Sequence, residues 1–383
     1  MSIAWFIFIT IVIILFQSSL YKNFGLTNIE YKRYFNRKEV FQGEQIEMID
    51  QIANKKLLPI PWLRLESKIN SNLSFQKEDN ERSNAEGDSF HRTLFSLLPY
   101  QKITRRHKVT CSKRGYYQLS TVSMSTGDAF GFGEFFRSIS AHTAVTVYPQ
   151  LIPVQDIPLP SHSWMGDLTV RRWIIDDPFI HAGVREYAYG DSMSSINWKA
   201  TARTTSLQVS KKDYTADHNL MIYLNFDETE DIWLPIRDEQ LFEKGLSYAA
   251  SIAQYAISKG VNTGFGCNGY LVEPFGTTDK IKESVRIEPK NNNSQLSLIW
   301  DTMAKLAIGR SMNFHYFLQE DITQKTSNLD ILIITQSVTE NTQTNIRQIE
   351  AQGNSVNVIR LSNDDERFGD GQGTMGEGER YAN

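Results

Sequence analysis

The hydrophobic pattern of this chain changes near residue 218, and that change limits the folds open to it. Before it, residues 28–150 hold short runs in which apolar and polar residues alternate. Such runs are typical of strands with one buried face. After it, residues 220–226 and 331–335 are almost continuously apolar, with helical patterns between them. Unbroken apolar strands indicate a parallel sheet buried on both faces. The sequence therefore predicts a β-sandwich followed by an α/β domain.

The same patterns place individual elements. Strands are predicted at residues 45–52, 62–69, 103–111 and 144–148 of the first domain, and at 261–267 and 356–361 of the second. Helices are predicted at residues 237–259, 296–308 and 338–352. Asp238 is expected to cap the first helix, and Gly260 and Gly353 to end the first and third. Residues 76–89 read as a loop.

The first residues form an apolar segment. Residues 3–16 are apolar apart from Thr10, and the run extended to residue 21 is about long enough to cross a bilayer. A cleaved signal peptide is the alternative, but no basic residue precedes the run and no convincing cleavage site follows it. The basic residues follow the run: Lys22, Lys32, Arg33, Arg37 and Lys38. This asymmetry predicts a single-pass anchor with the soluble domains in the cytoplasm.

Composition excludes several classes of function. With 383 residues the chain has room for two domains, and its net charge of −4 gives no general attraction to nucleic acid. Cys111 and Cys267 fall in separate predicted domains with no histidine nearby. They predict neither a zinc site nor a disulfide framework.

Residues 184–209 combine chemically distinctive side chains in a short space. Gly190 and Asp191 form a turn signal, and Asp191 stands where a helix N-cap would. Met193, Ile196 and Ala200 then follow at helical spacing, and an alternating Leu-x-Val strand comes after them. A turn, a helix and a strand are expected. The segment's candidate site residues are Arg185, Tyr187, Gly190, Asp191, Asn197, Trp198, Lys199 and Arg203.

These residues resemble the signature of the DUF58 family, membrane-anchored bacterial proteins whose own activity is not established. Further motifs of the family occur in the right order before it, at residues 40–44, 58–63, 114–116 and 128–131. The resemblance implies an immunoglobulin-like sandwich and a von Willebrand factor A-like α/β domain. It also implies partnership with a MoxR-type AAA+ ATPase and with a transglutaminase-like membrane protein. The family usually has a pair of apolar segments, and this chain shows one.

In intact von Willebrand A-like domains, an Asp-x-Ser-x-Ser loop, a distant Thr and a later Asp hold Mg²⁺. The matching loop here has Asn225 first, Asp227 in the middle and Thr229 last, and the later strand ends at Thr335 without an Asp. Two carboxylates are missing, which removes most of the attraction for a divalent cation. The expectation is a degenerate loop with no metal and no cofactor that still shapes a partner-binding edge.

Two interpretations of the signature's basic residues stay open. They could grip a phosphate or a partner's carboxylate. Alternatively, Arg185 and Arg203 pair with Glu186, Asp191 or Asp213 and stack on Trp198, which would fix a junction between domains. The second interpretation is preferred, because paired charges at junctions are commoner than ligand sites.

An enzymatic role has little support in the sequence. Gly190-Asp191-Ser192 resembles the first block of some esterases, but no Asp-x-x-His follows it, so Ser192 has no predicted base. A nucleophile elbow and a phosphate-binding loop are also absent from the sequence. The prediction is a non-enzymatic α+β multidomain scaffold. Its expected segments are a transmembrane anchor (1–21), a β-sandwich (28–150), a linker with the signature (151–215), an α/β domain (216–361) and a disordered tail (362–383). A hydrolase acting through Ser192 and an extracytoplasmic binding protein remain the alternatives.

Overall fold

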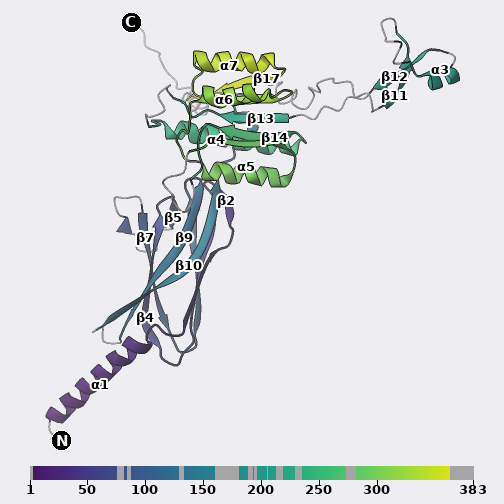
Figure 1. Ribbon diagram of the computed structural model, residues 1–383. Coiled ribbons are helices and arrows are strands. Elements are labelled where there is room, and N and C mark those ends of the chain that lie inside the picture. The colour runs from purple at the N-terminus through teal and green to yellow at the C-terminus, as the bar shows by residue number, and fades with distance from the viewer. Residues whose placement is uncertain are drawn as a thin grey trace, which may run out of the picture. The chain divides into compact units, whose positions relative to one another are not determined.

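The chain is an α+β protein with an apolar N-terminal helix (Figure 1). The computed structural model describes residues 3–75, 82–83, 88–128, 133–159, 181–188, 193, 196–204, 206–212, 219–228, 235–272 and 282–362. It divides into two compact units. Unit 1 consists of Met1–Leu151, Leu271–Ile281 and Trp300–Ala307, and unit 2 of Ile152–Tyr270, Lys282–Ile299 and Ile308–Asn383. The expected disordered tail lies outside the described residues, apart from Ser362.

Unit 1 begins with helix α1, Ile3–Phe24. Residues 3–16 of this helix are apolar on every side apart from Thr10, and most of its side chains are exposed. Within it, the 20 residues Trp5–Phe24 are long and apolar enough to cross a membrane. An isolated helix with no polar face has no place in water, because its apolar surface needs either lipid or a protein partner.

Two sheets follow α1 in unit 1. One has the strand order β1-β3-β8-β5 and the other β2-β10-β9-β4-β7-β6. Alternation of inward and outward side chains creates one apolar face on each sheet. The strands of the first sheet are β1 Ile29–Phe35, β3 Gln45–Asn54, β8 Lys102–Cys111 and β5 Leu73–Phe75. Those of the second are β2 Glu39–Phe41, β10 Glu134–Tyr148, β9 Gly115–Gly127, β4 Ile60–Asn70, β7 Asp88–Leu97 and β6 Arg82–Ser83.

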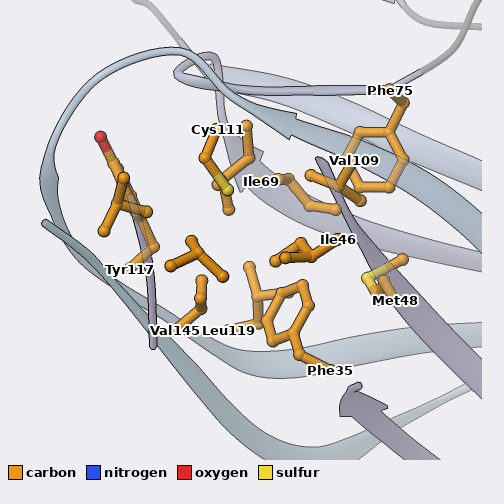
Figure 2. Packing of buried hydrophobic residues seen from close by; sticks show 13 residues of the cluster. Phe35, Ile46, Met48, Ile69, Phe75, Val109, Cys111, Tyr117, Leu119 and Val145 are labelled. Carbon is orange, nitrogen blue, oxygen red and sulfur yellow. The ribbon is translucent and has the colours of Figure 1, made fainter. Parts of the chain in front are cut away.

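The core of unit 1 lies between these two sheets. Figure 2 shows Ile46, Met48 and Val109 of the first sheet packed against Leu119 and Val145 of the second. All five are buried. Strands β3, β4, β8 and β10 contain the four predicted strands. The two packed sheets predicted from the alternation of apolar and polar residues are therefore confirmed. The stretch predicted as a loop also contributes β6 and the first residues of β7.

Unit 2 contains a sheet with the strand order β15-β14-β13-β16-β17. Its strands are β15 Val285–Lys290, β14 Asn262–Cys267, β13 Asn219–Leu224, β16 Asp330–Thr335 and β17 Ser355–Arg360. Strand β13 pairs in parallel with β14 and β16, and β16 pairs in parallel with β17, as predicted. Strand β15 pairs antiparallel with β14, which the prediction of a purely parallel sheet missed.

Helices cover both faces of this sheet (Figure 1). Helix α4, Glu239–Ser258, lies on one face, where Gly245 lets it approach Leu224 and Ile334. Asp238 accepts a hydrogen bond from the backbone N–H of Leu241, and Gly260 follows the helix with a φ of +86°, so both predicted ends are confirmed.

On the opposite face lie helices α6, Phe314–Gln324, and α7, Glu340–Ala351. Helix α6 was not predicted. Its apolar positions Phe314, Phe317 and Leu318 pack against β13 and β16. Helix α5, Asn293–Lys305, begins and ends three residues before its predicted bounds.

Candidate functional site

The loop that was predicted to be a degenerate metal loop lies at the carboxyl ends of β13 and β16. Ligands commonly bind at this edge of a parallel sheet. The side chain of Asn225 donates to the hydroxyl of Thr335 over 3.0 Å, so the structure brings together two predicted positions 110 residues apart. Thr335 in turn donates to the carbonyl of Ser337. The loop's third position, Thr229, lies outside the described residues. This edge is buried: Asn225 and Thr335 are both less than 3% exposed.

Asn268, at the end of β14, organises the rest of this edge. Its carbonyl oxygen accepts from the backbone N–H of Phe226, and its amide donates to Asp227 Oδ1 and to the carbonyl of Met312. The other oxygen of Asp227 accepts from the N–H of Phe314 over 2.7 Å, at the start of α6. Each carboxylate oxygen therefore already has a nitrogen donor. We call Asn225, Asp227, Asn268 and Thr335 the strand-end network.

Burial raises the pKa of Asp227, against the hydrogen bonds from Phe314 and Asn268 and the charge of Arg310. The hydrogen bonds of Asp227 and Asn268 hold three chain segments together at this point. Glu228, the next residue, accepts from the backbone N–H groups of Arg237 and Asp238 in front of α4. The expected absence of a metal stays a prediction, and the observed chemistry is that of a hydrogen-bonded brace.

The DUF58-like signature forms a hairpin with a short helix between its strands. Strand β11, His181–Glu186, pairs antiparallel with β12, Gln208–Lys212, and helix α3 is Trp198–Thr204. The side chain of Asn197 accepts from the N–H of Ala200 and caps α3. The predicted helix starting after Asp191 was therefore placed too early.

The hairpin has few buried side chains. Ile196 and Val209 form a β-bridge and are both buried. Tyr187 donates its backbone N–H to the carbonyl of Leu207, and Asn197 donates its own to Gln208. These contacts fix the backbone of the signature with only a small apolar core.

The signature's large and charged side chains point outward. Trp198 is 65% exposed and Met193 66% exposed. Arg185, Lys199 and Arg203 are also exposed. Arg185 donates to the carbonyl of Glu186. Gly190, Asp191, Ser192 and Asp213 lie outside the described residues, so neither the esterase-like block nor two of the proposed acidic partners is seen.

A second polar group, which the sequence analysis missed, lies inside the sandwich. The guanidinium of Arg33 (β1) binds both oxygens of Asp50 (β3), at 2.7 and 3.0 Å, and also donates to Ser67 (β4). Tyr31 donates to Asp50 over 2.7 Å, and His107 Nε2 lies 3.5 Å from the same carboxylate. Arg33 and Asp50 are 6% and 0% exposed.

Asp50, His91 and His107 have the donor types of a metal site, with ligand atoms within 4.8 Å of one another. Both oxygens of Asp50 are already bound by Arg33, however, and that guanidinium balances the charge that would attract a cation. Arg33 and Asp50 form a buried ion pair within the first sheet, and the hydrogen bond from Arg33 to Ser67 links this pair to the second sheet.

The ion pair makes stability depend on pH. Burial alone would raise the pKa of Asp50, but the nearby His107, the hydrogen bonds from Arg33 and Tyr31 and the charge of Arg33 hold it well below its ordinary value of 3.8. A lowered pKa means that the stabilisation is complete above pH 3.8 and is lost as the pH falls below it. Unit 1 should lose about 1 kcal/mol between pH 5 and pH 3 from this residue. Hydrogen exchange of β3 amides at both pH values measures the loss, which Asp50→Asn should abolish; an equal loss in that variant would contradict the assignment.

Comparison with known proteins places the signature in a family. Residues 183–359 match the model of a family described as protein of unknown function DUF58. The uncharacterized protein YeaD of Bacillus subtilis (strain 168) is 20% identical over 267 residues, which are 70% of this chain and 63% of YeaD. The match thus spans less than two thirds of that relative.

Solved structures resemble the chain only weakly. A CARDB domain from Pyrococcus furiosus, solved in complex with di-metal ions, is 13% identical, with a TM-score of 0.21 over 31% of this chain and 93% of that domain. A non-cellulosomal cohesin from Archaeoglobus fulgidus is 12% identical, with the same TM-score, over 31% of this chain and 91% of the cohesin. Likenesses this weak say nothing about ligands. The family match covers the signature hairpin and the sheet with its strand-end network, so this part of the chain, residues 183–359, is a DUF58 region.

Proposed function

We propose that this protein is a non-enzymatic, membrane-anchored scaffold whose DUF58 region binds another protein. In this proposal the sandwich is an immunoglobulin-like spacer, and unit 2 is a von Willebrand A-like domain whose metal loop has become a structural brace. The internal hydrogen bonds of Asn225 and Asp227 support the second point, because they use the loop's polar groups within the fold.

The observation that carries the proposal is the exposed surface of the signature hairpin. Trp198, Met193, Val184 and Leu207 are exposed on it together with Arg185. Tryptophan, methionine and arginine are enriched in protein interfaces, where a few such residues supply most of the binding energy. A surface of this kind fits a protein partner better than a small ligand, which needs a concave site.

Anchoring rests on α1. Its basic flank follows the apolar run, which favours a cytoplasmic location for both units. The partners that the family resemblance implies, a MoxR-type AAA+ ATPase and a transglutaminase-like membrane protein, are compatible with that side of the membrane. We take the ATPase as the partner of the signature hairpin.

Replacing the exposed tryptophan tests this proposal. Trp198→Ala should reduce recovery of the ATPase at least tenfold in a crosslinking pulldown from native membranes, because truncating an interface tryptophan commonly costs about 2 kcal/mol or more. Arg185→Ala should also weaken recovery. Tyr316→Ala is the matched control, since Tyr316 is an aromatic residue of α6 that is 56% exposed and lies outside the signature. Equal recovery with wild type and Trp198→Ala would contradict the signature's role as contact surface.

A further inference from the structure

A basic pocket of about 370 Å³ opens in unit 1 beside the end of α1. Strand register explains how it forms. Glu30 of β1 pairs with Ala53 of β3, and Ala53 pairs with Lys102 of β8. Paired residues lie on the same face of a sheet, so Glu30 and Lys102 stand on either side of a small alanine. Lys32, Lys55 and Tyr100 complete the pocket wall.

The pocket carries an excess of positive charge. It contains three lysines and one glutamate. The pKa of Glu30 is lowered by the hydrogen bond from Lys55 and by the charges of Lys55, Lys32 and Lys102, which oppose its small desolvation. All three lysines therefore contribute positive electrostatic potential at Glu30. An anion that entered the pocket would be attracted by the same charges.

The pocket is joined directly to the membrane helix. Lys56 donates to the carbonyls of Phe24, Gly25 and Thr27, which are left open where α1 ends. Its neighbour Lys55 donates its backbone N–H to Asn28. Tyr21 of α1 is buried and donates to the carbonyl of Pro59 over 3.1 Å. Helix and pocket thus belong to one packed assembly within unit 1.

Exposed apolar and aromatic side chains lie in the segments that lead into the pocket. Tyr100, which lines it, is 70% exposed, and Leu57, two residues after the lining residue Lys55, is 75% exposed. Tyr100 is tied to Lys56 by a backbone hydrogen bond. Leucine, tyrosine and lysine side chains together are typical of segments that lie at the headgroup level of a bilayer.

We propose that this pocket binds the phosphate headgroup of an anionic phospholipid in the bilayer that α1 spans. The inference rests on the proposed membrane anchoring and implies a fixed orientation of the sandwich at the membrane. A bound lipid would fix the sandwich at a set angle to the membrane rather than leave it free at the end of a helix. The lysines supply charge attraction, and the exposed Leu57 and Tyr100 supply contact with the acyl boundary.

The test measures lipid binding to the full-length protein in neutral detergent by native mass spectrometry. Wild type should retain phosphatidylglycerol at least tenfold more tightly than phosphatidylcholine. Lys32→Gln with Lys102→Gln should weaken phosphatidylglycerol binding about tenfold or more, since each lysine near an anionic surface contributes on the order of a fivefold change. Lys108→Gln is the matched control, a lysine that is exposed on the same strand as Lys102 but does not line the pocket.

Two further measurements distinguish a bound lipid from a bound phosphate ion and test the membrane anchor. Inorganic phosphate at 10 mM should leave the bound phosphatidylglycerol in place, because a free anion lacks the acyl contacts; complete displacement would overturn the assignment to lipid. Equal binding of the two lipids, or no loss in the double variant, would also overturn it. Carbonate extraction of native membranes tests the anchor separately. Release of the protein into the soluble fraction would refute anchoring. The lipid-binding measurement in detergent would still decide whether the pocket selects an anionic lipid.

Discussion

Asp50→Ala should destabilise unit 1 by about 3–5 kcal/mol, the range found when one partner of a buried ion pair is removed. The variant leaves the guanidinium of Arg33 inside the sandwich, where its side chain is 1% exposed and keeps the hydrogen bond to Ser67 but loses the carboxylate. It also removes the acceptor of Tyr31. Asp50 itself is fully buried, so these groups are left away from bulk water.

Hydrogen exchange of the β3 and β8 amides in detergent-solubilised protein measures this loss unit by unit, which a global melt of a two-unit chain does not. Glu47→Ala is the matched control. Glu47 lies on the same strand and pairs with Arg106, but both side chains are partly exposed, so the expected change is about 0–1 kcal/mol.

A double variant distinguishes the loss of the pair from the loss of packing. Arg33→Met with Asp50→Leu replaces both charges by apolar groups and should cost much less than Asp50→Ala alone. If the double variant lost as much stability as the sum of the single variants, the ion pair would not be the source of the effect.

The buried pair was visible in the sequence as an interruption of a pattern. In β1, Arg33 occupies an inward position between Tyr31 and Phe35, and in β3, Asp50 stands between Met48 and Ile52. A charged residue at an apolar position of an alternating strand needs a partner inside the core. That rule predicts two buried charges, but only the register Arg33↔Asp50 shows that they meet.

Local patterns predicted the elements of unit 2 well where a single helix or strand carried its own signal. The cap at Asp238 and the glycine after α4 are examples. Helix α6 was missed even though Phe314, Phe317 and Leu318 have helical spacing. The antiparallel edge strand β15 depends on pairing with β14, which no local pattern specifies.

The candidate site could be predicted only in part. Motif spacing located Asn225, Asp227 and Thr335, and the structure brings Asn225 and Thr335 into contact. Asn268 was not singled out, because a lone asparagine after a strand has no distinctive spacing. Its role depends on where the chain returns 41 residues after Asp227. The exposure of Trp198 was not predicted either, because the sequence favoured stacking of Arg185 and Arg203 on its ring.

Asn268→Ala should destabilise unit 2 by about 2–4 kcal/mol. Asn268 is 0% exposed, and its side chain makes three hydrogen bonds, to Phe226, Asp227 and Met312. Its truncation leaves a buried N–H and a buried carbonyl without their partner and removes one donor from the Asp227 carboxylate. Each buried polar group left unsatisfied costs about 1–3 kcal/mol. The strand ends and the start of α6 should then separate locally.

The amides of Phe226 and Phe314 report this directly, since one is bound by Asn268 and the other by Asp227. Both should exchange at least tenfold faster in Asn268→Ala, while amides in the sandwich keep their protection. Asn262→Ala is the control at the other end of β14, because Asn262 is only partly buried and bonds the side chain of Asn219. It should change stability by about 1 kcal/mol or less. If the Phe226 amide in Asn268→Ala kept its protection from hydrogen exchange, the strand-end network would not stabilise this edge. The loop would then have to be held by another ligand, such as a metal or a partner.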